Sequence, residues 1–170
     1  RILVKEAGAL EKLSNVNAIV FDKTGTLTIE QPHVARIHPF NGLDEAAILT
    51  IAAAAEARQT HPIARAIMTA ASELGLELPA IDEARYEMGY GIKVRLAMNG
   101  TAGNRPLVRV GSRRFMRMES IAVPPEVDAL AADCQAQGHS LVMVALNDEL
   151  VGCLELQPTV RPEAQAVIQY

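Results

Sequence analysis

The chain has 170 residues, a formal net charge of -4 and a hydrophobic fraction of 49%. This length suffices to bury a real core and to form one domain, or one domain with an appendage. Because the Lys and Arg residues are scattered along the chain, the composition argues against nucleic acid or an anionic membrane surface as the main partner.

Neither the cysteines nor the apolar runs indicate a disulfide framework or a membrane span. Cys134 and Cys153 stand far apart, with no Cys-X-X-Cys motif, so a reducing, cytosolic setting is expected. The most apolar run, residues 46–55, is too short to cross a bilayer and predicts a buried helix. Since the chain begins at Arg1 without a Met and stops soon after Pro162 opens a helical pattern, we expect a fragment of a longer protein.

The first elements expected along the chain are a short helix and a strand. The helix is predicted around residues 6–13. Residues 18–21 form a continuous apolar run, which is typical of a central parallel strand. Pro32 and residues 38–42 then mark a change of segment, after which the pattern turns to helices and antiparallel strands.

Two helices are predicted next, as a hairpin. The first is expected to be capped by Asp44 and to run to about Arg58. The second is expected to be capped by Thr60, with Pro62 in its first turn and Gly75 at its end. One face of the first helix is expected to consist of Ile48, Ile51, Ala52 and Ala55.

The remaining elements are mostly strands. Residues 92–98 alternate with period two and predict a half-buried strand, with residues 106–110 as its neighbour. A helix is predicted over residues 124–138, followed by strands over 140–146 and 149–156. The expected side of the first strand is formed by Ile92, Val94, Leu96 and Met98. This order predicts an α/β fold, in which an antiparallel sheet flanked by helices is inserted between fragments of another unit.

The segment "IVFDKTGTLT", residues 19–28, carries the strongest chemical signal. Asp22 stands at the carboxyl end of the predicted strand, where open α/β sheets bind their ligands. Lys23, Thr24 and Thr26 would supply a cation and hydroxyls near a phosphate, and Gly25 permits a tight turn. An aspartate that attacks a phosphoryl group forms an acyl phosphate and needs a divalent cation, for which Asp22 and the Thr24 carbonyl are natural Mg²⁺ ligands. The alternative is an aspartate that only caps a turn.

"DKTGTLT", residues 22–28, resembles the phosphorylation signature of the P-type ATPases, members of the haloacid-dehalogenase-like superfamily. The resemblance implies that Asp22 accepts a phosphoryl group from ATP, assisted by Lys23 and Thr24, with Mg²⁺ held by Asp22 and Thr24. Soluble phosphatases of this superfamily usually carry a second Asp two positions after the nucleophile, as general acid and base. Because Thr24 stands there instead, the phosphoenzyme is expected to persist.

"EARQTHPIARAI", residues 56–67, resembles the E-x-x-S-x-H-P segment of the heavy-metal-transporting P-type ATPases, with Gln59 in place of the Ser. The resemblance implies that Glu56, His61 and Pro62 belong to an ATP site. At the start of a helix, the His61 ring can meet the adenine face or edge, while Glu56 accepts from the exocyclic amine.

Two glycine turns extend the resemblance. Gly89 and Gly91 match the family's G-x-G turn, although Val94 replaces a small residue after it. Gly111 and Ser112 match its V-G-N turn, with Ser112 in place of the Asn. These four residues are therefore expected at the nucleotide.

A return segment completes the resemblance, which covers nearly the whole chain. Residues 150–164 resemble the strand and helix that lead back into the phosphorylation domain. Pro158 stands where an Asp commonly precedes the x-x-R of that segment, so a role for this position in phosphate or Mg²⁺ chemistry is not expected.

The family pattern implies an organisation in three parts. Residues 1–31 are expected to begin a Rossmann-like phosphorylation domain, 32–155 to form the nucleotide-binding domain, and 156–170 to return into the phosphorylation domain. In the intact pump, at the cytoplasmic face of a membrane, bound ATP would phosphorylate Asp22. The implied partners are ATP and the rest of the pump: membrane helices, an actuator domain and the remainder of the phosphorylation domain.

The fragment alone is expected to bind nucleotide with little or no turnover. Two alternatives remain open from the residues: a soluble phosphatase of the same superfamily, and a regulatory nucleotide-binding module without catalysis.

Several other polar and sulfur-containing residues are expected to have no role at the site. The residues expected to be solvated are His33, His38, His139, Arg113 and Arg114. For the two arginines, the alternative is an approach to phosphates. Met116 and Met118 are expected to pack along one edge of a short helix, and Cys153 in the core.

Overall fold

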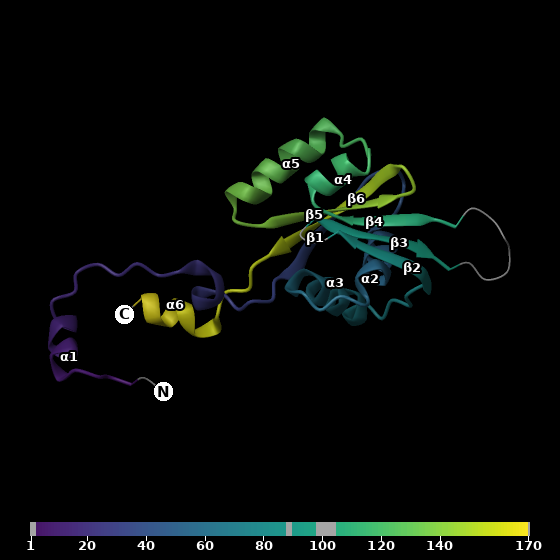
Figure 1. Ribbon diagram of the computed structural model, residues 1–170. Coiled ribbons are helices and arrows are strands. Elements are labelled where there is room, and N and C mark those ends of the chain that lie inside the picture. The colour runs from purple at the N-terminus through teal and green to yellow at the C-terminus, as the bar shows by residue number, and fades with distance from the viewer. Residues whose placement is uncertain (1–2, 88–89, 98–104, 170) are drawn as a thin grey trace.

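The computed structural model describes residues 3–87, 90–97 and 105–169, which contain a six-stranded antiparallel sheet (Figure 1). The strands follow one another across the sheet in the order β1-β6-β5-β4-β3-β2. Their bounds are β1 His33–Pro39, β2 Ile81–Glu87, β3 Gly91–Leu96, β4 Leu107–Gly111, β5 Ser140–Leu146 and β6 Glu149–Gln157.

Helices cover both faces of the sheet. In Figure 1, α2 and α3 lie against one face, and α4 and α5 lie against the other. Helices α1 and α6 lie with a π-helical turn, η1, beyond the strand ends where the chain enters β1 and leaves β6. Their bounds are α1 Ala7–Leu13, η1 Lys23–Leu27, α2 Glu45–Glu56, α3 Pro62–Glu73, α4 Arg113–Met118, α5 Pro125–Ala136 and α6 Pro162–Ile168. In the described part of the chain, these helices are all too short or too polar to cross a membrane.

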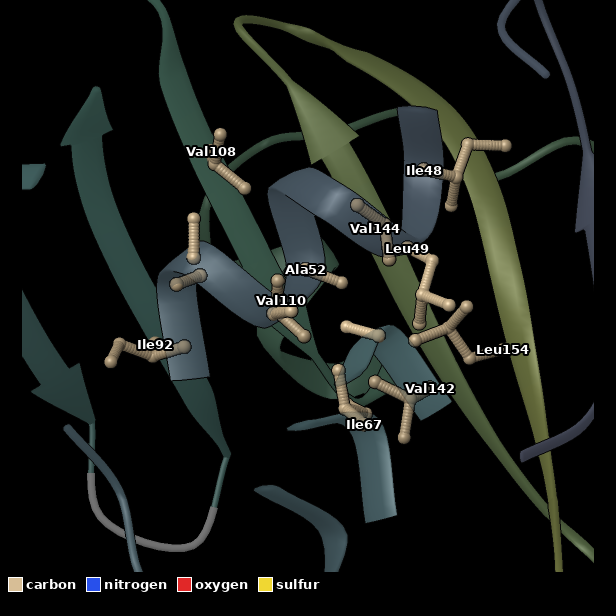
Figure 2. Packing of buried hydrophobic residues seen from close by; sticks show 14 of the residues in the cluster. Ile48, Leu49, Ala52, Ile67, Ile92, Val108, Val110, Val142, Val144 and Leu154 are labelled. Carbon is tan, nitrogen blue, oxygen red and sulfur yellow. The ribbon is translucent and has the colours of Figure 1, made fainter. Parts of the chain in front are cut away.

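The larger core fills the space between α2, α3 and the sheet (Figure 2). Because side chains alternate along a strand, β3 directs Ile92, Val94 and Leu96 to this face. Residues 52–55 of α2 are four successive buried alanines, so this part of the helix is covered around most of its circumference. The larger side chains shown are Ile48, Leu49, Ile67, Ile92, Val108, Val110, Val142, Val144 and Leu154.

A smaller core lies beneath α4 and α5. It centres on Phe115 and Met116 and includes Cys153, as expected from its apolar strand. The expectation for Met118 is wrong, because this side chain is exposed whereas Met116 is buried. Residues two apart on a helix do not share a face, so the two methionines cannot pack along one edge.

Most predicted elements are confirmed. The helix over residues 6–13, both helices of the hairpin, the helix after Pro124 and the four strands from residue 91 onward are present. Asp44 caps α2, since its Oδ1 accepts from the Ala47 N–H at 2.7 Å. The α/β class and the antiparallel sheet flanked by helices are likewise confirmed, while the three-part division remains a prediction. Met98 lies outside the described residues.

The predicted cap of α3 is off by one residue. His61, rather than Thr60, is the N-cap, and its ring Nδ1 accepts from the Ala64 N–H at 3.2 Å. Pro62 occupies the first helical position, which suits its fixed φ and missing N–H, so the preceding residue becomes the cap. This shift aims the imidazole back toward the end of α2.

One predicted strand is absent, and two strands were not predicted. Residues 18–21 are not a strand, and Val20 is 96% exposed, because no strand in the described part of the chain lies beside them to pair with their backbone. Conversely, β1 and β2 were not expected. They are the two edge strands, and edge strands carry charged residues and proline that obscure the apolar alternation.

Candidate functional site

A cavity of about 250 Å³ lies where α2 ends, α3 begins and the strands β3, β4 and β5 meet. Five of the residues predicted to bind nucleotide line it: Glu56, His61, Gly91, Gly111 and Ser112. Pro62 instead sets the cap of α3, and Gly89 lies outside the described residues. The remaining wall is mostly apolar, from Ile63, Val110, Leu141 and Val142.

Glu56 and His61 meet across the break between the two helices. Their Oε2 and Nε2 atoms lie 3.2 Å apart. Because Nδ1 accepts the backbone N–H of Ala64, a neutral ring must carry its proton on Nε2, the nitrogen that faces Glu56. The helix cap thus selects the tautomer whose N–H is on the side of Glu56, although no hydrogen bond is formed between the two side chains in the described residues.

This contact does not behave as an ion pair. Burial raises the pKa of Glu56 to about 7, and burial together with the nearby charge of Arg65 lowers the pKa of His61. Mutual attraction between charged partners would move both pKa values the other way. The geometry agrees, because Oε2 of Glu56 is buried without a hydrogen bond in the described residues despite the short distance to His61. The cavity wall therefore holds a carboxylate oxygen that can accept from a ligand.

Gly91 and Gly111 are required by packing inside the fold. They are partners across β3 and β4. A Cβ on Gly91 would come within 2.4 Å of Phe115 Cδ1, and one on Gly111 within 2.7 Å of the Gly91 Cα. Phe115 is fully buried and cannot move aside without opening the smaller core. The bare backbone at this wall is thus explained by the fit of Phe115, independently of any ligand.

Tyr90 belongs to the cavity wall and was missed by the sequence reasoning, which treated the residue between the two glycines as variable. The guanidinium of Arg114 lies over its ring, 4.4 Å from the centroid. The Tyr90 carbonyl accepts from the Ser112 N–H at 2.9 Å. The sequence signal that could have identified Tyr90 as part of the site is an aromatic residue inside a G-x-G turn.

The two arginines are at least partly exposed, as expected, but each also has a partner on the protein surface. Arg114 stacks on Tyr90, and Arg113 donates to Asp128 at 2.6 Å. Ser112, which stands in for Asn, caps α4, because its Oγ accepts from the Phe115 N–H at 3.3 Å. Its hydroxyl oxygen is therefore already engaged within the fold.

The Asp22 turn is a second, separate feature. Asp22 is exposed, precedes η1 in an extended conformation and makes no capping hydrogen bond with its side chain, so the alternative of a turn-capping aspartate is not supported. Gly25 has φ +80°, which an L side chain rarely adopts. The buried Thr28 closes the turn, since its N–H and its hydroxyl both donate to the Lys23 carbonyl, at 3.1 and 3.2 Å.

The described residues do not form a complete metal site around Asp22. Asp22 offers a hard carboxylate oxygen of the kind that Mg²⁺ prefers. Within the described ranges, no three His, Cys, Asp or Glu side chains converge in a way that could hold a metal. The side chain of Thr24 lies outside the description, so its role remains a prediction, as does that of Lys23, whose Nζ lies 3.5 Å from the Gly138 carbonyl.

A second buried carboxylate, Glu155, overturns the expectation that His38 and His139 are solvated. His38 Nε2 lies 2.9 Å from one carboxylate oxygen and His139 Nδ1 2.7 Å from the other. These hydrogen bonds, that of His38 first, hold the pKa of Glu155 below its ordinary value. His33 Nδ1 lies 3.2 Å from the Thr159 hydroxyl in an exposed position.

Comparisons with known proteins agree with the motifs. A family model described as a haloacid dehalogenase-like hydrolase matches residues 16–170. The zinc/cadmium/lead-transporting P-type ATPase of Escherichia coli is 35% identical over 167 residues, which are 98% of this chain and 21% of that protein. The probable copper-exporting P-type ATPase of Archaeoglobus fulgidus is 36% identical over 168 residues, which are 99% of this chain and 19% of that protein. The chain thus spans about a fifth of the length of these relatives.

Solved structures extend the similarity to the fold. The crystal structure of a zinc-transporting PIB-type ATPase matches with a TM-score of 0.77 and 34% identity, over 98% of this chain and 26% of that one. The N-domain of a copper-transporting P-type ATPase matches with a TM-score of 0.58 and 26% identity, over 72% of this chain and 98% of that one. The chain is homologous to heavy-metal P-type ATPases along nearly its whole length and belongs to the haloacid dehalogenase-like hydrolase family.

Proposed function

We propose that the chain is the ATP-binding and phosphorylation fragment of a heavy-metal cation-translocating P-type ATPase. In the intact pump, ATP held at the cavity donates its γ-phosphoryl group to Asp22. The observation that carries this proposal is the buried, unpartnered carboxylate oxygen of Glu56 beside Nε2 of His61, in an otherwise apolar cavity.

The cavity suits adenine better than a whole nucleotide. Its volume of about 250 Å³ falls below the range of roughly 300–1,000 Å³ that is usual for drug-sized ligands. An exocyclic amine would donate to Glu56 and satisfy its buried oxygen, which otherwise costs free energy. The apolar wall would cover the flat faces of the base, while the phosphates would extend out of the cavity.

Asp22 is suited to act as the phosphoryl acceptor. Its exposed carboxylate can approach the γ-phosphorus. A carboxylate oxygen forms the new P–O bond as the bond to the β,γ-bridging oxygen breaks, which leaves an acyl phosphate and ADP. Mg²⁺, held in part by the Asp22 carboxylate and the Thr24 carbonyl, would neutralise charge between the reacting anions.

The residue at position 24 argues against a phosphatase activity of this chain. Threonine has no carboxylate to activate water, so the acyl phosphate would persist long enough to drive a conformational change. Coupling to transport requires the other parts of a pump, namely membrane helices, an actuator domain and the rest of the phosphorylation domain. As part of such a pump, the fragment would lie at the cytoplasmic face of a membrane.

Nucleotide titration of the full-length pump tests the cavity. Glu56→Ala and His61→Ala are each expected to weaken ATP binding by about 1–3 kcal/mol, the cost of a lost partner in a buried site. Glu45→Ala, at the exposed start of the same helix, is the matched control and should bind as the wild type does. Unchanged titrations for both cavity variants would contradict the proposed nucleotide site.

Phosphorylation of the same pump tests Asp22. ATP and Mg²⁺ are expected to yield a base-labile phosphoenzyme that disappears in Asp22→Asn. A phosphoenzyme that survives this substitution would show that another residue is the acceptor.

A further inference from the structure

The segment after β6 runs alongside the Asp22 turn. The Ile29 N–H donates to the Thr159 carbonyl at 2.9 Å, and the Arg161 N–H donates to the Leu27 carbonyl at 2.9 Å. Between these bonds, Thr28 and Val160 form an antiparallel bridge. Figure 1 shows the chain leaving β6 and passing beside the turn on its way into α6.

The side chain of Arg161 extends this pairing to the turn itself. Its Nε donates to the Thr26 carbonyl at 2.9 Å and its Nη2 to the Gly25 carbonyl at 3.1 Å. With its backbone N–H on Leu27, one residue thus donates to three successive carbonyls. The planar fork of a guanidinium suits two neighbouring acceptors, whereas a lysine ammonium is a single point donor.

The turn depends on outside donors because of its geometry. A π-helical turn is rare and is frequently found at functional sites. Within η1, the Lys23 carbonyl accepts from Thr28, which closes the wide turn. Since a carbonyl fixes the plane of its peptide group, the bonds from Arg161 set the orientation of the next peptide units after Gly25.

We infer that Arg161 is a positioning residue for the phosphorylation of Asp22. It holds the turn that follows Asp22 in one conformation. It also links the segment before β1 to the segment after β6 by hydrogen bonds. This inference rests on the proposed function. Arg161 acts on the reaction through the turn and makes no contribution to the adenine cavity, whose walls come from other elements.

The test uses the full-length pump with Arg161→Lys, which keeps the charge but loses the fork. The rate of phosphoenzyme formation at saturating ATP is expected to fall by about 10- to 100-fold, because a small misplacement of a reacting group has effects of this size. The dissociation constant for ATP should stay within about twofold of the wild-type value, since the cavity is unaltered. Arg117→Lys, an exposed arginine on α4, is the control and should leave both quantities unchanged.

A second measurement shows whether the substitution loosens the turn alone or the whole fold. Hydrogen exchange of the amides in residues 25–29 is expected to quicken in Arg161→Lys, while exchange in β4 and β5 stays as in the wild type. Wild-type phosphorylation by this variant, or unchanged exchange in the turn, would overturn the inference. A loss of ATP affinity equal to the loss in rate would also overturn it, because Arg161 would then act on the nucleotide.

The two proposals fail in different ways. If the wild-type pump forms no phosphoenzyme, or forms one that survives Asp22→Asn, the proposed function fails. If the wild type is phosphorylated on Asp22 and Arg161→Lys is phosphorylated equally fast, only the positioning role fails.

Discussion

Glu56 and Glu155 are two buried glutamates in opposite situations. They are 4% and 7% exposed, so burial alone does not distinguish them. Glu155 receives a histidine on each oxygen and its pKa is lowered, whereas Glu56 has an oxygen without a hydrogen bond in the described residues and a pKa raised to about 7. The hydrogen-bond donors around a buried carboxylate therefore decide whether the carboxylate stabilises the fold or keeps an oxygen that can accept from a ligand.

The largest effect is expected from removing the satisfied carboxylate. Glu155→Ala should lower the free energy of unfolding by about 3–5 kcal/mol, because two hydrogen bonds to a charged group are lost at once. Urea denaturation at pH 7 measures this loss. Glu149→Ala, an exposed residue of the same strand, should change stability by less than about 0.5 kcal/mol. Equal effects of the two substitutions would contradict a stabilising role for the buried carboxylate of Glu155.

The unsatisfied carboxylate should respond in the opposite direction. The pKa of Glu56 rises from 4.5 to about 7 on folding, so its protonated form is favoured and stability falls as pH rises through this window. Glu56→Gln should therefore be more stable than the wild type at pH 8, by up to about 3 kcal/mol, and equally stable below pH 4.5. Denaturation at several pH values checks the slope, which Glu45→Gln should leave unchanged.

The pH dependence for Glu155 has the other sign. Because its folded pKa is lowered from 4.5, its contribution is present above pH 4.5 and is lost as pH falls through the folded pKa. Acid denaturation should therefore show a stability loss in the wild type that Glu155→Gln lacks. A loss of equal size in both proteins would contradict the assignment.

ATP should bind more tightly as Glu56 ionises, since a carboxylate accepts from an amine better than a carboxylic acid does. Affinity is expected to rise by up to about tenfold, or 1.4 kcal/mol, per pH unit below a pKa of about 7. Titration at pH 6 and pH 8 measures the rise. In Glu56→Gln, the pH dependence of ATP affinity that comes from the ATP phosphates should remain, and the part that comes from residue 56 should disappear. A pH profile identical to that of the wild type would exclude Glu56 as the acceptor.

The smallest effect concerns the cap that aims His61 at Glu56. His61→Ala should destabilise the fold by about 1 kcal/mol through the lost cap, whereas Thr60→Ala should change stability by less than about 0.5 kcal/mol. Thermal unfolding distinguishes the two. The reverse order would mean that Thr60 caps the helix in solution.

The contrast between the two glutamates also shows how far the sequence reasoning reached. Glu56 and His61 lie five positions apart around a helix break, so a local pattern could bring them together. Glu155 and His38 lie 117 positions apart and meet only because β1 pairs with β6, a pairing that requires the unexpected edge strand. Tyr90 and Arg114 likewise meet through the pairing of β3 with β4, which no short motif encodes.

The failed strand at residues 18–21 has a different cause. Its apolar pattern is clear, but an apolar run indicates only a tendency to form a strand. A strand also requires hydrogen bonds from a neighbouring strand, which the sequence of the run does not supply. The motif that follows it was nevertheless informative, because Gly25 and Thr28 shape the turn through local bonds. Local chemistry could thus be predicted where long-range pairing could not.

The adjacency of β1 and β6 has a consequence for how such a module can be moved between proteins. His33 and Gln157 are paired residues at the points where the chain enters and leaves the sheet. A host domain could therefore accept this unit in a single surface loop without parting its own ends, as domain insertions generally require.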